Sequence, residues 1–479
     1  AGGTRHSTKE QSLLLNNETG SFSLYSNRIG SSSALTGVYS AGSAGGFDLK
    51  IQLDSDDRIF GLGDVTRDRI EKTGFRSAIW VRNVASYVPV PVLLSFRGWG
   101  IFLNTSYKIF FDIGYRDERV LHVWGPKGPA DLFLFTGADP AELLKRLTAI
   151  TGRPKLLPEY AYGLTFVSNQ QVNAREMLDD CQKLREHGMP CDTIGLEPGW
   201  MENYYDASTT KEWHHERFYI PPWVRGKESP QTFAAAAGRL GFKLSLWLCC
   251  EYDLTWEEER RAQRRAPSLG GEGEAAGDSR IETPASMARH EDDFEQDDHF
   301  GHNPRRLDST TIPEEPWFKH LEKFVDDGAR AFKMDGAYQV NEHPDRMYGN
   351  GLGDDANHNL YPIILNKQMD RGYVEYTGKR SLIYSSGGYA GIQRYAATWA
   401  GDTGGGPKPL TSMLNHGLSG HVNTSCDMEI FSPEGIHFGF LQPWSQICSW
   451  AYWRHPWLLD TEMRKIFLRY NRFHYAILP

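Results

Sequence analysis

The segment ARAFKMDGAYQV, Ala329 to Val340, begins with an apolar run of strand length that leads into Lys333 and Asp335 and stops at Gly336. Residues 153–479 contain six more runs of this kind: AYGLTF, CDTIGL, FKLSLWL, SLIYSS, AATWAGD and SGHVNTSCD. Short apolar runs are typical of strands that are buried on both faces of a parallel sheet. The fold therefore depends on what connects them.

Helical patterns connect several of these runs. Asn173 and Glu176 form a capping box, an apolar stripe follows at helical spacing (Met177, Cys181 and Leu184), and Gly188 ends the pattern. A second helix is predicted to begin at Pro316, a residue suited to the first helical position, and to stop at Gly328. Strands that alternate with helices predict a parallel sheet, and seven or eight such units in roughly 300 residues favour a (β/α)8 barrel over an open sheet.

In the first part of the chain the apolar residues are spaced differently. Short runs such as FDLKIQL and GIFLN are separated there by Gly, Asn, Asp and Ser turn residues. This pattern predicts an N-terminal β-sandwich over residues 1–152, followed by the barrel over residues 153–479. Residues from about 257 to 313 are charged, rich in Gly and poor in apolar side chains. We expect a partly disordered surface loop there, with a lid over the barrel mouth as the alternative.

Composition narrows the classes of function. The formal net charge of the 479 residues is −9, which argues against a nucleic-acid or anionic-membrane surface. No run of about 18 apolar residues occurs, so no membrane-spanning helix is expected. Six cysteines without a CxxC pair are interpreted mostly as buried thiols. The first residue is Ala and no apolar leader follows, so we expect a trimmed or processed start; a cytoplasmic or secreted location and the oligomeric state stay open.

Four acidic residues stand at the ends of predicted strands: Asp335, Glu197 in TIGLEPGWM, Asp402 in AATWAGD and Asp427 in NTSCDMEIF. In a barrel of this kind the strand ends meet at one mouth, where catalytic residues are found. No HxH or HExxH pattern accompanies the acids, so no metal is predicted. Glycoside hydrolysis is the other common use of such a group, because it requires two carboxyl groups flanking one bond.

Several motifs, in order, resemble glycoside hydrolase family 31, the α-glucosidase and α-xylosidase relatives. They are FGLGD (Phe60 to Asp64), PVPVLLSFRGWGIFLNTS, TGRPKLLPEYAYG, LREHGMPCDTIGL, GGYAGIQRYAATWAGD, HGLSG and RYNRFHYAILP. The resemblance implies a β-sandwich before a (β/α)8 barrel. The last motif resembles the helix that precedes a further β-domain in the family, so we expect the distal C-terminal β-domains to be absent from this chain.

The resemblance also implies roles for two residues and no cofactor. Asp335 aligns with the family's nucleophile and Asp402 with its general acid/base, which implies a retaining enzyme with a covalent glycosyl intermediate. Lys333 lies on the same strand face as Asp335, where it would favour the carboxylate form. Trp399 and the glycines near Asp402 suggest a drier setting that would favour a protonated acid.

Other positions depart from the family pattern. Lys333 replaces an aromatic residue before the nucleophile, Glu197 replaces an Asp, Ser386 stands where the family has a sugar-binding Arg, and Cys448 stands where glucose-specific members have a His. Such losses argue against a plain α-glucosidase. The substrate-binding residues predicted from strand ends and alignment are Glu197, Trp200, Lys333, Ser386, Trp399, Asp427 and Cys448.

The Lys-x-Asp order of Lys333 and Asp335 resembles α-galactosidase families of a related clan, so a galacto-configured sugar is slightly favoured: an α-galactoside or an N-acetyl-α-galactosaminide within an oligosaccharide or glycoconjugate. In the alternative, Lys333 simply pairs with a nearby acid, and the chain is an α-glucosidase, an α-xylosidase or a transglycosylase. A non-catalytic carbohydrate-binding relative is the third possibility, which the retained aspartates oppose.

Overall fold

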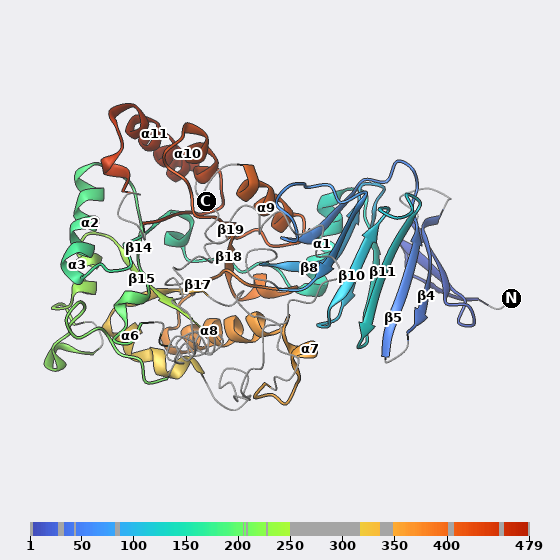
Figure 1. The fold of residues 1–479 in the computed structure, drawn as a ribbon, viewed down its shortest axis with the longest axis horizontal. Helices are drawn as coiled ribbons and strands as arrows, with labels where there is room; N and C mark the ends of the chain where they lie inside the picture. The colour runs from blue at the N-terminus through green and yellow to red at the C-terminus, as the bar shows by residue number, and fades with distance from the viewer. Residues whose placement is uncertain are drawn as a thin grey trace, which may run out of the picture.

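The computed structural model describes residues 3–26, 33–42, 45–81, 87–204, 206, 209–226, 229–249, 317–335, 348–400, 407–449 and 455–477 (Figure 1). The predicted loop insertion at about 257–313 lies outside these residues, as does Asp402.

Two antiparallel sheets form the N-terminal part and confirm the predicted β-sandwich. The first sheet has the order β1 (Thr4–Ser7), β2 (Gln11–Leu15), β3 (Ser21–Ser26), β4 (Ser33–Ala41), β5 (Gly45–Gln52), β11 (Val120–Lys127), β10 (Ile109–Ile113) and β7 (Phe75–Ile79). The second has the order β12 (Asp131–Thr136), β9 (Trp99–Asn104), β8 (Pro89–Ser95) and β6 (Ile59–Gly63). Alternate apolar residues of both sheets, such as Leu49 and Ile101, are buried in one shared core.

A parallel sheet of eight strands follows and confirms the predicted (β/α)8 barrel. Its order is β19 (Thr424–Ser425), β18 (Ala397–Trp399), β17 (Leu382–Ser385), β16 (Ala329–Met334), β15 (Lys243–Leu248), β14 (Thr193–Leu196), β13 (Leu164–Val167) and β20 (Ser445–Cys448). A parallel bridge between Asp427 and Gln446 brings the segment after β19 onto β20. The two ends of the sheet therefore meet, and the strand ends face a common mouth.

Helices cover the strands on the outside (Figure 1). Within the described residues the α-helices are α1 (Pro140–Thr151), α2 (Ala174–Glu186), α3 (Phe233–Arg239), α6 (Glu322–Asp327), α7 (Asp354–Asn357), α8 (Tyr361–Thr377), α9 (Pro407–Gly417), α10 (Pro433–Phe440) and α11 (Thr461–Ile477). Short 3-10 turns lie at η1 (Glu159–Tyr162), η2 (Pro198–Trp200), η3 (Pro222–Val224), η4 (Trp317–Leu321), η5 (Ile392–Arg394) and η6 (Pro456–Leu458).

Helix α2 forms as its sequence predicts. The Asn173 side chain accepts from the backbone N–H of Glu176, and the Glu176 side chain accepts from the backbone N–H of Asn173. The predicted apolar stripe is buried against the barrel, and Gly188 takes the left-handed conformation that ends the pattern (φ 61°). Pro316, the predicted start of the second helix, lies outside the described residues. From Trp317 the segment forms the 3-10 turn η4 and then α6, and Gly328 stops it as expected.

Helix α9 lies on the side of the barrel that faces the N-terminal sheets (Figure 1). It is therefore placed between the sandwich and the strand ends β18 and β19. Among the described residues, no helix combines the length and the apolar character needed to cross a bilayer.

Candidate active site

Three of the four acids predicted at strand ends lie within the described residues, and each stands at the carboxyl end of a barrel strand. Glu197 directly follows β14, Asp335 directly follows β16, and Asp427 comes two residues after β19. Asp402 lies outside the described residues; the strand that precedes it, β18, ends at Trp399. Since all strands of the sheet are parallel, these ends meet at one mouth.

Asp335 is partly buried and held by three neighbouring groups. Its backbone N–H donates to the carbonyl of Leu248 at 2.9 Å. The indole N–H of Trp247 donates to Asp335 Oδ2 at 2.8 Å, and the Ser386 hydroxyl makes a longer contact to Oδ1 at 3.5 Å. Donors on both oxygens fix the orientation of this carboxyl group. The predicted site residue Ser386 thus contacts the predicted nucleophile.

Lys333 is buried and forms an ion pair with Glu197. The Lys333 Nζ lies 3.0 Å from Glu197 Oε1, and the Cys448 Sγ lies 4.0 Å from Nζ and 3.8 Å from Oε1. Burial alone would lower the pKa of Lys333. Four groups outweigh it and raise that pKa well above its usual value, in order Cys448, Glu197, Asp335 and Asp427. Lys333 is therefore a fixed cation among acids.

Trp399 and Asp427 complete the strand-end group. The Lys333 Nζ lies 5.2 Å from the centroid of the Trp399 ring, a cation–π distance. Asp427 is fully buried, and its Oδ1 accepts from the side-chain amide of Gln446 at 2.5 Å. The structure thus brings together Asp335, Glu197, Lys333, Trp399 and Cys448, with Asp427 among the groups that raise the pKa of Lys333.

Trp200 does not join this group. Its side chain is fully buried and packs edge-on against Trp213 and Phe324, at centroid distances of 5.0 and 4.9 Å. Its indole N–H donates to the backbone carbonyl of Trp247 at 2.8 Å. The turn η2 directs the Trp200 side chain into the aromatic core, so the geometry gives no support to the prediction that Trp200 contacts substrate.

Two residues of the site were missed from the sequence, Trp247 and Gln446. The strand register places Trp247 directly beside Lys333, so its position inside FKLSLWL next to the strand end was a usable signal. The sequence gives no comparable signal for Gln446, because its contact with Asp427 depends on the closure of the barrel.

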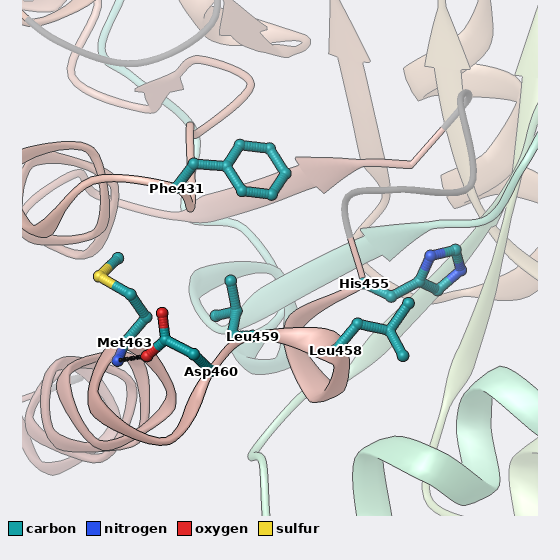
Figure 2. Close-up of a pocket in the computed structure, with 6 residues that line it drawn as sticks. All are labelled: Phe431, His455, Leu458, Leu459, Asp460 and Met463. Carbon is teal, nitrogen blue, oxygen red and sulfur yellow. Dashed lines mark hydrogen bonds between the residues drawn. The ribbon is translucent and has the colours of Figure 1, made fainter.

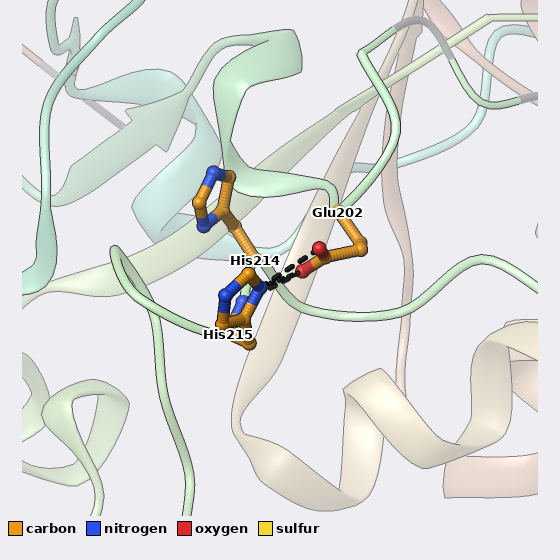
Figure 3. A group of neighbouring side chains, drawn as sticks. All are labelled: Glu202, His214 and His215. Atoms are coloured by element: carbon orange, nitrogen blue, oxygen red, sulfur yellow. Dashed lines mark hydrogen bonds and ion pairs between the residues drawn. The ribbon is translucent and has the colours of Figure 1, made fainter.

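One group of side chains in the described part of the chain has the composition of a metal site: Glu202, His214 and His215 in the loop after β14 (Figure 3). Nδ1 of His215 lies 2.8 Å from both carboxylate oxygens of Glu202, and this hydrogen bond raises the pKa of His215. Nδ1 of His214 accepts from the backbone N–H groups of Glu216 and Arg217 at 3.2 and 3.3 Å. Both Nδ1 atoms are engaged within the loop, so we assign it a structural role.

A pocket also opens beside the N-terminus of α11 (Figure 2). Its lining consists of Phe431, His455, Leu458, Leu459, Asp460 and Met463. Asp460 there accepts from the backbone N–H of Met463 at 2.9 Å and so caps the helix. None of the predicted sugar-binding residues lines this pocket.

Family comparisons agree with the fold. Residues 154–479 match the glycosyl hydrolases family 31 TIM-barrel domain, and residues 4–112 match the glycosyl hydrolase 31 N-terminal galactose mutarotase-like domain. The chain belongs to glycoside hydrolase family 31. The resemblance of its motifs to that family is thereby confirmed.

Individual relatives in family 31 are distant. The chain is 23% identical to an α-xylosidase of Emericella nidulans over 440 residues, which cover 86% of this chain and 52% of the relative. It is 22% identical to α-glucosidase 2 of Bacillus thermoamyloliquefaciens over 487 residues, which cover 89% of this chain and 55% of the relative. The chain thus spans about half the length of the curated relatives it matches.

Solved structures share the fold. A family 31 dextranase of Flavobacterium johnsoniae, complexed with isomaltotriose, superposes with a TM-score of 0.76 at 18% identity and covers 100% of this chain and 60% of its own. A cycloalternan-forming enzyme of Listeria monocytogenes, in complex with a pentasaccharide substrate, gives a TM-score of 0.73 at 17% identity, over 100% of this chain and 50% of its own.

These comparisons do not support the galacto-configured preference. The relatives reported above are named for xylose, glucose or glucans, and none is named for galactose. The structure removes the basis of that preference as well, because Lys333 is paired with Glu197. The alternative drawn from the sequence, that Lys333 pairs with a nearby acid, is confirmed. The gluco- and xylo-configured alternatives are therefore favoured.

Proposed function

We propose that this family 31 chain carries the active site of a retaining α-glycosidase that removes a terminal α-linked gluco- or xylo-configured sugar. The observation that carries the proposal is Asp335. It stands at a barrel strand end with Trp247 N–H and the Ser386 hydroxyl on its two oxygens, beside the buried pair of Lys333 and Glu197.

The reaction follows from two carboxyl groups with different protonation states. The carboxylate of Asp335 attacks the anomeric carbon while the acid Asp402 protonates the departing glycosidic oxygen. The product of this step is a β-linked glycosyl ester on Asp335. Asp402, now a base, takes a proton from water while the water oxygen attacks the same carbon. The ester bond to Asp335 breaks, its carboxylate is released, and the sugar leaves with its α configuration retained.

The neighbouring charges bear on the kind of sugar. Glu197, Asp335 and Asp427 surround the single ammonium of Lys333, which is already engaged by Glu197. A sulfonated or carboxylated sugar would meet more negative than positive charge in this group. A neutral sugar is favoured because its hydroxyls can donate to carboxylates and accept from the ammonium.

The test is a panel of 4-nitrophenyl α-glycosides (gluco, xylo, galacto and N-acetylgalactosamino), run in parallel on wild type and on Asp335→Ala. Release from the glucoside or the xyloside, abolished in Asp335→Ala, is the expected result. Azide added to Asp335→Ala should restore release and yield the β-glycosyl azide, because the anion enters from the face that the carboxylate has vacated.

Azide added to Asp402→Ala should instead yield the α-glycosyl azide, since the glycosyl ester on Asp335 still forms. These opposite anomers assign the nucleophile and the acid/base separately. Release only from the galactoside would contradict the choice of sugar. A folded wild-type protein that binds glycans and cleaves none of the panel would contradict the catalytic proposal.

A further inference from the structure

Helix α9 begins five residues after Asp402 and is held by polar groups of the β-sandwich. Asp64 is the last residue of the FGLGD motif and is buried. Its Oδ1 accepts from the hydroxyl of Ser412 on α9 at 2.7 Å, and its Oδ2 pairs with Arg67 at 3.1 Å. The Arg67 guanidinium in turn lies 4.7 Å from the centroid of the Tyr87 ring. Asp64 is thus fixed from the sandwich side and presents one oxygen to the helix.

A buried lysine makes the second link. Lys72 is fully buried, and its ammonium donates to the carbonyls of Ile70 at 2.8 Å and Arg69 at 3.2 Å and to Oδ1 of Asn415 on α9 at 2.9 Å. The side-chain amide of Asn415 donates back to the carbonyl of Thr66 at 3.0 Å. Both polar atoms of Asn415 are therefore used to tie α9 to the sandwich.

The opposite face of α9 packs on the barrel. Met413 lies in a small buried cluster with Ala400, which directly follows β18, and Cys426, which directly follows β19. The Ala400 N–H donates to the carbonyl of Ser425 at 2.8 Å. The chain is therefore anchored at Ala400 and again at α9, and the six residues 401–406, with Asp402 among them, connect these two anchors.

We propose that this interface, which we call the α9 clamp (Asp64, Arg67, Lys72, Ser412 and Asn415), positions the general acid/base of the barrel by fixing the helix that follows it. The inference rests on the proposed function. The clamp residues act through Asp402 and are positioning residues. A general acid must stand within hydrogen-bond reach of the leaving oxygen, and a misplacement of about 1 Å can cost on the order of a hundredfold in rate.

The polar side chains of the clamp are better suited to orienting α9 than to simply joining it to the sandwich. Apolar side chains would join two domains without the cost of burying charges, whereas a buried lysine and a buried carboxylate are costly unless every donor and acceptor is satisfied. Their value lies in geometry, because directional hydrogen bonds tolerate little rotation or sliding of α9. An exposed ion pair between the same two segments, Lys408 with Asp68 at 3.2 Å, makes no comparable demand.

The experiment compares Lys72→Met with wild type on two substrates of whichever sugar, glucose or xylose, the panel identifies. The α-glycosyl fluoride needs little protonation of its leaving group, whereas the methyl α-glycoside needs full protonation. We expect kcat/KM to fall about tenfold or more on the methyl glycoside and less than about twofold on the fluoride. Ser412→Ala is the gentler second variant, in case Lys72→Met does not fold, and should change the two substrates in the same direction.

Lys408→Met is the matched control and should leave both substrates unchanged. Equal losses on both substrates would overturn the proposal, because they would indicate general damage to the site, and so would equal rates in variant and wild type. Failure of the proposed function gives a different result: wild type then cleaves neither substrate. Hydrogen exchange of α9 in Lys72→Met and Lys408→Met decides in that case whether the clamp fixes the helix, and unchanged protection in Lys72→Met would overturn the clamp itself.

Discussion

Lys333 at the barrel mouth and Lys72 at the sandwich interface are both buried, yet their surroundings have opposite effects. Lys333 lies 3.0 Å from the carboxylate of Glu197. Burial would lower its pKa, but Cys448 and the acids Glu197, Asp335 and Asp427 raise it well above its usual value. Lys72 is held by two backbone carbonyls and one amide oxygen. Burial, with help from Arg69 and against the attraction of Asp64, lowers its pKa to about 7.

The difference shows what each region requires of a buried amine. Full charges of opposite sign keep the ammonium of Lys333 protonated across the whole working pH range, so the mouth carries a permanent cation. Carbonyl dipoles orient the Lys72 ammonium but do not fully compensate its buried charge, so Lys72 is partly deprotonated at neutral pH. The predictions below remove or test the feature that separates the two lysines.

Removing the partner of Lys333 should have the largest effect. Glu197→Gln keeps the shape of the side chain and removes its charge, so it leaves Lys333 buried without its ion pair. Breaking a buried pair in this way should lower the free energy of unfolding by about 3 kcal/mol. Urea unfolding at pH 7 measures the loss.

The double variant Glu197→Gln with Lys333→Met is the control for this result. Because it leaves no uncompensated charge, it should recover a large part of the lost stability. A change of less than about 0.5 kcal/mol in Glu197→Gln alone would show that the remaining acids compensate Lys333 without Glu197.

The pH dependence of stability should reveal the second lysine. The pKa of Lys72 is about 7 in the folded chain against a reference value of 10.5. Between these two values the unfolded chain binds more protons at this residue, so stability must rise with pH. Relative to Lys72→Met, wild type should gain about 2 kcal/mol in its free energy of unfolding between pH 7 and pH 9.

Unfolding of both proteins at a series of pH values isolates this contribution, because all other groups titrate alike in the two. The double variant Glu197→Gln with Lys333→Met serves as the contrast and should lack the effect of Lys72→Met. It removes both charges of the pair together, and Lys333 has its folded pKa raised, so wild type gains nothing from it as pH rises to 9. Parallel pH curves for wild type and Lys72→Met would show that Lys72 keeps an ordinary pKa.

The sequence predicts the features that depend on local patterns. The strand before Asp335 and the capping box of Asn173 and Glu176 are both found where they were expected. Local sequence patterns do not predict the partners of the two lysines, because Glu197 is 136 residues from Lys333 and Asn415 is 343 residues from Lys72. Such pairs are set by strand register and domain packing.

Differences between the predicted and the observed site have the same origin. The preference for a galacto-configured sugar followed from Lys333 standing two residues before Asp335, whereas the role of that lysine depends on Glu197, which another strand supplies. Trp200 stands three residues after Glu197 and was predicted to contact substrate for that reason. The local turn sends it into the core, which sequence distance alone does not reveal.

Two buried tryptophans allow the same kind of comparison for uncharged hydrogen-bond donors. They differ mainly in whether the indole N–H has a hydrogen-bond partner. Trp247 donates to Asp335 Oδ2 at 2.8 Å, whereas the N–H of Trp444 has no hydrogen-bond partner in the described part of the chain. Both rings are buried. Replacing either by Phe removes similar packing area, so the stability lost through packing should be similar in thermal unfolding, and Trp247→Phe should lose the hydrogen bond to Asp335 in addition.

Their activities should separate. A hydrogen bond to a charged group contributes about 1.5–3 kcal/mol, so Trp247→Phe should lower kcat/KM by about tenfold or more, and Trp444→Phe by less than about twofold. Steady-state kinetics on the substrate identified by the panel measures both. If the two variants lose the same activity, Trp247 serves Asp335 through packing alone. The hydrogen bond from Trp247 to Asp335 would then contribute no more to catalysis than the N–H of Trp444, which makes none.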